Sequence, residues 1–242
     1  MKVIDATWEK RNLGLDVIEV AVDEGDSCEE LRSALESVTT PYSVVKIPAG
    51  DIPLLMTAQE AGYKLIETGM TIEGNIKRVA TPKIYSRFMP FIEIREANEQ
   101  ELSKILEEVS RGEIFSTDRI AVDPAFSKEI AGRRYYNWCC DVMQKGAMME
   151  VALYKGQPVA FNLSMLKNER GLSDGLIGGV FDEAKNMGFG FLVAELEMDL
   201  CKKLGGKICL GRVSSNNAAI LRLHMQYGFE VKSIQYVLIK HQ

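Results

Sequence analysis

A turn between an apolar strand and an amphipathic helix carries the residue pattern of a phosphate site. It reads Lys185-Asn186-Met187-Gly188-Phe189-Gly190. Glycines at two spaced positions leave no Cβ in the way, so several backbone N–H groups can gather at the start of the helix. The partial positive charge of a helix N-terminus favours an anion there, and Lys185 adds a full charge. The pattern predicts a cradle for phosphate.

The same turn lacks the features of the better-known nucleotide loops. It has no Gly-Lys-Ser or Gly-Lys-Thr ending, and its glycine spacing does not complete the dinucleotide fingerprint. A phosphate ligand of another kind is therefore implied. Glycines between a strand and a helix can also serve only to turn the chain, and this stretch by itself leaves that alternative open.

A second stretch makes the pattern specific. Residues 214–229 read SSNNAAILRLHMQYGF, an Asn-initiated helix closed by Gly228-Phe229. Together with residues 180–190 it resembles, in order and separation, the two signatures of the GNAT superfamily of N-acetyltransferases. In that family an Arg or Gln precedes the glycine turn that grips the pyrophosphate of acetyl-CoA, and Lys185 stands in its place here. The resemblance covers about Phe91 to the C-terminus and implies the GNAT fold, a mixed α/β sheet.

The resemblance also implies which residues hold acetyl-CoA (coenzyme A). In the family, the strand before the turn splays from its neighbour and the pantetheine arm pairs with it. The two glycines of the matching strand would permit a bulge and close backbone approach, or would merely weaken the strand. Asn217 matches an Asn that contacts the cofactor and is also a favoured N-cap residue. The expected cofactor residues are Ile177, Gly178, Gly179, Val180, Lys185, Asn186, Met187, Gly188, Phe189, Gly190 and Asn217.

One residue departs from the family pattern at the catalytic position. His224, four residues before Gly228, stands where many family members carry a Tyr that protonates the leaving thiolate. A His with an ordinary pKa near ~6.5 is mostly neutral at neutral pH but still donates one N–H. We hypothesise that His224 acts as the acid or hydrogen-bond donor; the alternative is a His that only fills the helix face. The general base is open, with Asp118, Asp123, Asp174 and a water chain as candidates.

The acceptor amine is expected at the loop of residues 115–126 and the helix after it. We expect Phe115, Asp118 and Tyr135 to contact it, with Tyr136 and Trp138 as further walls. Aromatic residues at helical spacing are also common in cores, which is the competing interpretation. The opening TWEKRNLGLD, followed by a half-domain and a full domain, is loosely similar to GNAT enzymes that acetylate an amino sugar on a nucleotide.

Composition narrows the class of partner. A net charge of −5 among 242 residues argues against a nucleic-acid surface, which needs clustered Lys and Arg. No apolar run approaches the ~20 residues that span a bilayer, so a cytoplasmic protein is expected. Five cysteines and two histidines, without a CxxC motif, predict reduced thiols and no metal site. We expect a small-molecule amine as partner, no nucleic acid or membrane, and allow for a homodimer.

Apolar periodicity predicts the elements that position these motifs. Strands are expected over residues 17–22, 42–47, 63–72, 91–95, 149–154, 158–165, 176–181, 207–213 and 229–239. Helices are expected from Ser27 to about Val38 and over residues 51–61, 99–109, 128–143, 190–204 and 217–226. Residues 115–126 are expected to form a loop and residues 81–90 a linker.

An internal repeat suggests two domains. An offset of 166 places Gly62 on Gly228 and Asp51 on Asn217, so strand, polar corner, helix, Gly-aromatic and strand occur twice. We predict a degenerate GNAT-like half-domain without a cofactor site over 1–85 and a GNAT acetyltransferase domain over 86–242.

The function predicted from these observations is transfer of an acetyl group from acetyl-CoA to a primary amine, with an amino sugar nucleotide as one acceptor. A small amine, an amino acid or a peptide N-terminus is the alternative acceptor. A non-catalytic acyl-CoA-binding protein is the alternative from another functional class.

Overall fold

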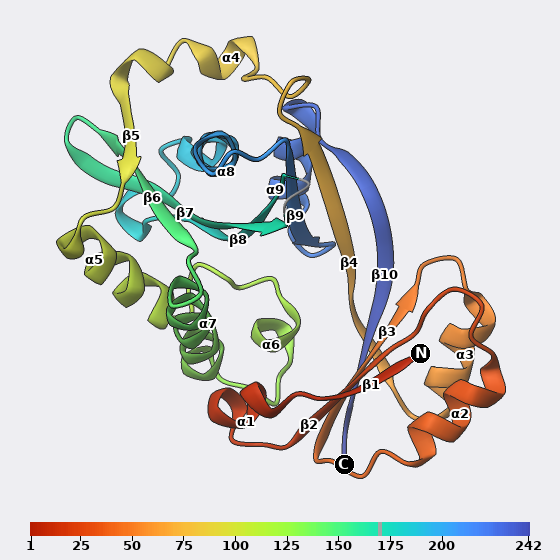
Figure 1. The fold of residues 1–242 in the computed structure, drawn as a ribbon. Coiled ribbons are helices and arrows are strands. Elements are labelled where there is room, and N and C mark those ends of the chain that lie inside the picture. Colours follow the sequence, from red (N-terminus) through yellow and green to blue (C-terminus); the bar gives the residue numbers. More distant parts are fainter. Residues whose placement is uncertain (169–170) are drawn as a thin grey trace.

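The computed structural model describes residues 1–168 and 171–242, and its strands form one ten-stranded sheet (Figure 1). The strand order is β1-β2-β3-β10-β4-β9-β8-β7-β6-β5. The strands are β1 (Lys2–Asp5), β2 (Val17–Ala21), β3 (Tyr42–Pro48), β4 (Lys64–Asn75), β5 (Ile92–Glu96), β6 (Met148–Tyr154), β7 (Gln157–Asn168), β8 (Leu172–Val180), β9 (Ile208–Ser214) and β10 (Glu230–His241).

The helices of the described residues lie on both faces of this sheet. They are α1 (Thr7–Leu13), α2 (Cys28–Glu36), α3 (Ile52–Glu60), α4 (Lys83–Ser86), α5 (Glu99–Ser110), α6 (Arg119–Val122), α7 (Lys128–Met143), α8 (Leu192–Lys203) and α9 (Ala218–Gln226), with short 3₁₀ turns η1 (Met89–Phe91), η2 (Asp182–Ala184) and η3 (Phe189–Phe191). None of these helices is long and apolar enough to cross a membrane.

Local capping fixes several helix starts. Ser27 and Glu30 form a capping box at the start of α2. Asp51 and Asn217 cap α3 and α9 by accepting hydrogen bonds from backbone N–H groups three residues on. These side chains satisfy donors that a helix start leaves open, which is why the sequence located these starts well.

The C-terminal half packs helices against both faces of β5 to β8. α8 lies on one face and α5 with α7 on the other, as Figure 1 shows. Leu192 and Leu196 of α8 are fully buried on the first face, and Ile105 of α5 with Cys139 of α7 on the second. This two-sided cover buries the central residues of β6 and β7, among them Val151, Phe161 and Leu163.

The strands of the N-terminal half pack against helices from both halves of the chain. α2 and α3 cover one face of β2 and β3, where Leu31 and Leu54 are buried. The other face packs against α1 and against Ile120 of α6 and Ala131 of α7. The two halves therefore share a core.

The predicted repeat is present in the element bounds. Adding 166 to the bounds of β3, α3 and β4 gives 208–214, 218–226 and 230–241, the bounds of β9, α9 and β10. β2 pairs in parallel with β3 as β8 does with β9. Each half thus contributes a strand-helix-strand-helix-strand unit.

The two repeats exchange their last strands. β4, from the N-terminal half, lies between β9 and β10, and β10 lies between β3 and β4. β4 and β10 pair antiparallel around Gly69 and Gln235, which are equivalent under the offset of 166. An extra residue forms a bulge at the equivalent positions Ile66 and Lys232. Because one sheet contains strands of both halves, the boundary at residues 85 and 86 stays a prediction.

Some elements differ from the sequence prediction. β1 and α1 were not predicted, and the expected loop 115–126 contains α6, which Asp118 caps. The region 81–90 forms α4 and η1, and Tyr85 stacks on Phe191 with ring centroids 4.8 Å apart. β8 begins at Leu172, earlier than predicted, because its first residues pair with β9.

Candidate active site

The splay expected between two parallel strands begins after Gly175. β8 pairs with β9 only from Leu172 to Gly175. From Leu176 to Val180 it pairs with β7 alone, so its other edge carries backbone groups without a partner strand. In the N-terminal repeat, β2 and β3 pair over the full length of β2 and leave no such opening. The opening exists in only one of the two repeats.

The glycines of β8 act differently from the prediction. The irregularity in β8 falls at Leu176, because Leu163 pairs with Ile177 and Ser164 with Gly175. A Cβ on Gly178 would lie 2.7 Å from Val193 Cγ1, and a Cβ on Gly179 would lie 2.7 Å from Ile114 Cγ2. The expected bulge at the glycines was wrong; the missing side chains allow neighbours on both faces to approach the strand.

The predicted phosphate turn lies at the end of β8, with helix α8 beginning at Leu192 rather than Gly190. η3 runs straight into α8, and the backbone is left-handed at Asn186 and Gly188. Among the described residues, no acceptor is found for the N–H groups of Gly188, Phe189 and Gly190. A Cβ on Gly188 or Gly190 would meet nothing within 4 Å, so the turn is open. Open, unpaired N–H groups suit a phosphate.

Charge at this turn is partly neutralised within the chain. The Lys185 ammonium forms an ion pair with Asp182, one turn earlier. Met187 is exposed beside it. Lys185 therefore reaches a phosphate only in competition with an acidic neighbour.

The opening continues into a cavity of about 460 Å³. Ile177, Gly178, Gly179, Val180, Lys185 and Asn217 line it at one end, and Phe115, Asp118 and Tyr135 also line it. The structure therefore brings the expected cofactor strand and the expected acceptor residues to one cavity. Trp138 lines it too, whereas Tyr136 is exposed and is not among the lining residues.

His224 lines this cavity but is held by protein groups on both sides. Its Nδ1 lies 2.9 Å from the Ile220 carbonyl and its Nε2 3.1 Å from Glu197 Oε2. Burial disfavours the charged ring, but the hydrogen bond and charge of Glu197 outweigh it and raise the pKa of His224. Glu197 could not be singled out from sequence, because it lies on the inner face of an ordinary amphipathic helix.

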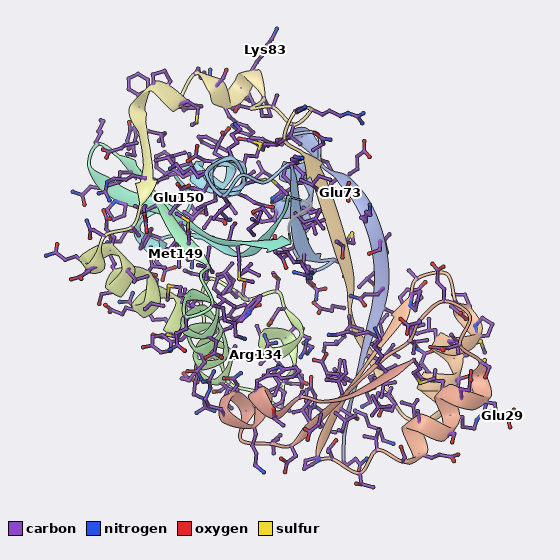
Figure 2. The ribbon with its side chains drawn as sticks, viewed as in Figure 1. Glu29, Glu73, Lys83, Arg134, Met149 and Glu150 are labelled. Atoms are coloured by element: carbon purple, nitrogen blue, oxygen red, sulfur yellow. The ribbon has the colours of Figure 1, made fainter. Side chains whose placement is uncertain are left out.

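The acceptor end is built from an aromatic pair and a charge network. Phe115 stacks on Tyr135 with centroids 4.1 Å apart, and the Tyr135 hydroxyl donates to Asp118 at 2.7 Å. Arg134, labelled in Figure 2, and Arg119 both bind Glu9 of α1. Burial raises the pKa of Tyr135 well above its ordinary value, so its hydroxyl stays protonated.

The three candidate bases from sequence are all occupied. Asp123 is buried against His241 at 2.8 Å, and Asp174 accepts two hydrogen bonds from Arg212. Neither lines the cavity. Asp118 lines it, but its oxygens serve the Ala121 N–H, the Tyr135 hydroxyl and Arg134.

Sequence reasoning missed a second carboxylate in the cavity. Glu67 lies on β4, in the half that was expected to hold no part of the site. In the sequence, Glu67 appears only as an acidic residue within a predicted strand. Its role could not follow from that signal, because the strand exchange that brings β4 beside β9 has no local signature.

Comparison with known proteins gives the fold. No family model matches the chain, and no curated protein matches its sequence. A GCN5-related N-acetyltransferase from Kribbella flavida matches with a TM-score of 0.61 and 14% identity over 93% of this chain and 81% of that one. A conserved protein of unknown function from Staphylococcus epidermidis matches with a TM-score of 0.61 and 14% identity, over 94% and 84%.

A third structure comes from a larger protein. It is the glucosamine N-acetyltransferase region of a fungal multi-domain β-N-acetylglucosaminidase, with a TM-score of 0.56 and 14% identity over 81% of this chain and 25% of that one. Identities this low establish architecture rather than activity. The chain has the mixed α/β fold of the GNAT acetyltransferases.

Proposed function

We propose that this protein transfers an acetyl group from acetyl-CoA to a primary amine. The observation that carries the proposal is the opening at the unpaired edge of β8: Ile177 to Val180 of this edge and Lys185 of the open turn line the same cavity. The turn offers N–H donors for a pyrophosphate, and the strand edge offers backbone partners for an amide-containing arm. When bound, acetyl-CoA supplies an activated acetyl thioester.

The residues of this chain would divide the remaining tasks. The N–H groups at Gly188 to Gly190, with Lys185, would hold phosphate, and Asn217 lines the cavity as Lys185 does. The stacked pair Phe115 and Tyr135 forms an apolar wall that excludes water from the acceptor. His224 would act on the leaving sulfur only after Nε2 releases Glu197.

We propose an amino sugar on a nucleotide as the acceptor class. The similarity of the opening and the domain order to TDP-fucosamine acetyltransferase supports it, and so does the glucosamine N-acetyltransferase activity named for one structural neighbour. Aromatic walls beside hydrogen-bonding carboxylates and arginines suit a polar ring with an apolar face. A small amine, an amino acid or a peptide N-terminus is the competing acceptor.

A non-catalytic acyl-CoA-binding protein is the second candidate function. Two observations favour it: both ring nitrogens of His224 have protein partners, and Lys185 is paired with Asp182. In this alternative the fold retains the cofactor site without its proton donor.

Calorimetric titration with acetyl-CoA, with an unrelated nucleotide as control, tests the proposal first. Saturable one-to-one binding to acetyl-CoA alone is expected. Release of free thiol with a panel of nucleotide-linked amino sugars, free amino sugars, amino acids and peptides then tests transfer. Binding without thiol release on the whole panel would favour the non-catalytic protein, and absence of binding would refute both candidates.

A further inference from the structure

We propose that Glu67, which the N-terminal half places in the cavity through β4, is the general base that takes a proton from the acceptor amine. This inference rests on the proposed function and adds to it a catalytic residue from the other half of the chain. It also gives the half without a cofactor site a part in the reaction.

The first argument is elimination among the charged groups of the cavity. Within the described residues, the other charged side chains that line it are each in an ion pair. Lys46 binds Glu19, Arg119 and Arg134 bind Glu9, Asp118 binds Arg134, Lys185 binds Asp182, Arg212 binds Asp174, and His224 binds Glu197. Glu67 forms no ion pair, and its Oε2 is buried without a hydrogen-bond partner. A buried carboxylate oxygen without a partner lowers the stability of the fold, and this cost needs an explanation, which a functional role of Glu67 provides.

The second argument is the backbone that aims Glu67. Ile66 is the extra residue of a bulge between β4 and β10, because Glu67 pairs with Val237 and Leu65 with Leu238. Ile66 packs into the core with Val237, and Glu67 lines the cavity. A bulge of this kind changes the direction of a side chain and is common beside active sites.

The third argument is the charge environment. Burial raises the pKa of the Glu67 carboxyl; a hydrogen bond from the Ser214 side chain and the charges of Arg119 and Arg134 oppose the rise, while Asp118 adds to it. Lys46, opposite the same Val237 across β10, is bound to Glu19 at 2.6 Å. A carboxylate with a raised pKa is a stronger proton acceptor than an exposed one.

The proposed step balances in protons and electrons. Glu67 takes one proton from the ammonium, which leaves the nitrogen lone pair free. The nitrogen forms a bond to the acetyl carbon, and the bond from that carbon to sulfur breaks with its electrons going to sulfur. The second proton lost by nitrogen ends on that sulfur as a thiol, and Glu67 returns its proton to water.

The test compares Glu67→Gln with Glu67→Asp and with Glu73→Gln as the matched control. Glu73 lies on the same strand, towards its other end (Figure 2), and pairs with the exposed Lys232. Acetyl-CoA affinity by calorimetry checks that each variant retains the cofactor site. Kinetic constants for an amine that the wild type acetylates are then measured across pH.

If Glu67 is the base, Glu67→Gln lowers kcat/KM for the amine by about 10²-fold or more near neutral pH and abolishes the rise of wild-type activity on the acidic side. Glu67→Asp retains that rise at a reduced rate, and Glu73→Gln matches the wild type. A kcat of Glu67→Gln within about threefold of the wild type would overturn the assignment. So would a raised KM with kcat and pH profile intact, because this result identifies an anchor for the ammonium instead.

Different measurements refute the two proposals: the wild type tests the proposed function, and the Glu67→Gln variant tests the role of Glu67. A wild type that binds acetyl-CoA but acetylates no amine refutes the proposed function, and this inference falls with it. A wild type that acetylates an amine, with Glu67→Gln equally active, refutes only the role of Glu67.

Discussion

His224 Nε2 and Glu197 Oε2 lie 3.1 Å apart where solvent hardly reaches either side chain. The second oxygen of Glu197 has no partner among the described residues and approaches Gly175 and Gly211, the last paired residues before the splay. The Nδ1 side is held by the Ile220 carbonyl, so the ring is fixed at both nitrogens. The pair therefore lies beside the point where β8 and β9 separate.

This pair predicts a pH-dependent stability. The folded pKa of His224 is raised, so its contribution is fully present below the unfolded value near ~6.5 and is lost as pH rises through the folded value. Glu197→Gln removes the charge that raises the pKa. We expect it to cost about 1–3 kcal/mol of unfolding free energy near pH 6 and less at pH about 9. Urea denaturation at both pH values measures the difference, and a cost independent of pH would contradict the ion pair.

His224→Phe tests the catalytic hypothesis at the same position. If His224 protonates the leaving thiolate, the variant loses turnover most below the raised pKa of His224, where the wild-type ring carries the proton, and least at high pH. Acetyl-CoA binding should change little, because His224 lies on α9 and not in the predicted phosphate turn of residues 185–190. Turnover unchanged across pH would leave His224 with a purely structural role, paired to Glu197.

Asp182→Asn should strengthen acetyl-CoA binding. Lys185 is paired with Asp182, and the acidic charge opposes a phosphate at the turn. Neutralising Asp182 removes both effects, for which we expect a three- to tenfold gain in affinity, about 1 kcal/mol, at low salt. Calorimetry at two salt concentrations checks it, and the gain should shrink at high salt. Lys104→Met, on α5 and paired with the exposed Glu183, is the control.

Two glycine substitutions compare the stability cost of a methyl group at a closely packed position and at an open one. A Cβ on Gly178 would lie 2.7 Å from Val193 Cγ1 and 2.8 Å from Asn162 Nδ2, so Gly178→Ala should cost about 1–3 kcal/mol of stability through overpacking. A Cβ on Gly190 would meet nothing within 4 Å, so Gly190→Ala should leave stability unchanged to within about 0.5 kcal/mol. Equal unfolding midpoints in urea for the two variants would show that β8 moves to accommodate the methyl group.

The elements with local signals were predictable from sequence. α7 was predicted from Lys128 to Met143 and has those bounds, because Ser127 caps it and a polar turn follows. α6 was missed because four residues are too short for helical periodicity. The Gly178-Gly179 pair was assigned to a bulge because a glycine pair has the same appearance whether it bends a strand or admits a neighbour.

The long-range parts of the site could not be predicted. The repeat at an offset of 166 was visible, but its apolar pattern is equally satisfied when β4 pairs within its own half or next to β9. Glu67 enters the cavity only through the second pairing. The predicted phosphate turn, by contrast, is a single contiguous stretch, so its open backbone could be predicted from local sequence, while its role as a cofactor site stays a prediction.

The strand exchange makes a last prediction, about autonomy of the two halves. In residues 86–242 alone, β9 and β10 would lose β4, which pairs with both of them, and β10 would also lose β3. Two long unpaired edges and the apolar residues beneath them would be exposed. We expect the fragment 86–242 to aggregate when produced alone and to become soluble and folded when produced with the fragment 1–85.

Cooperative unfolding of the intact chain provides the complementary measurement. Because β4 and β10 are central in one sheet, circular dichroism and tryptophan fluorescence should report the same transition in urea, since Trp8 lies in α1 and Trp138 in α7. A fragment 86–242 that folds alone with full helix content, or two separated transitions, would mean that the C-terminal half closes its sheet without β4. β4, which carries Glu67, would then not be needed to form the C-terminal part of the sheet, and the strand exchange would not be required for folding.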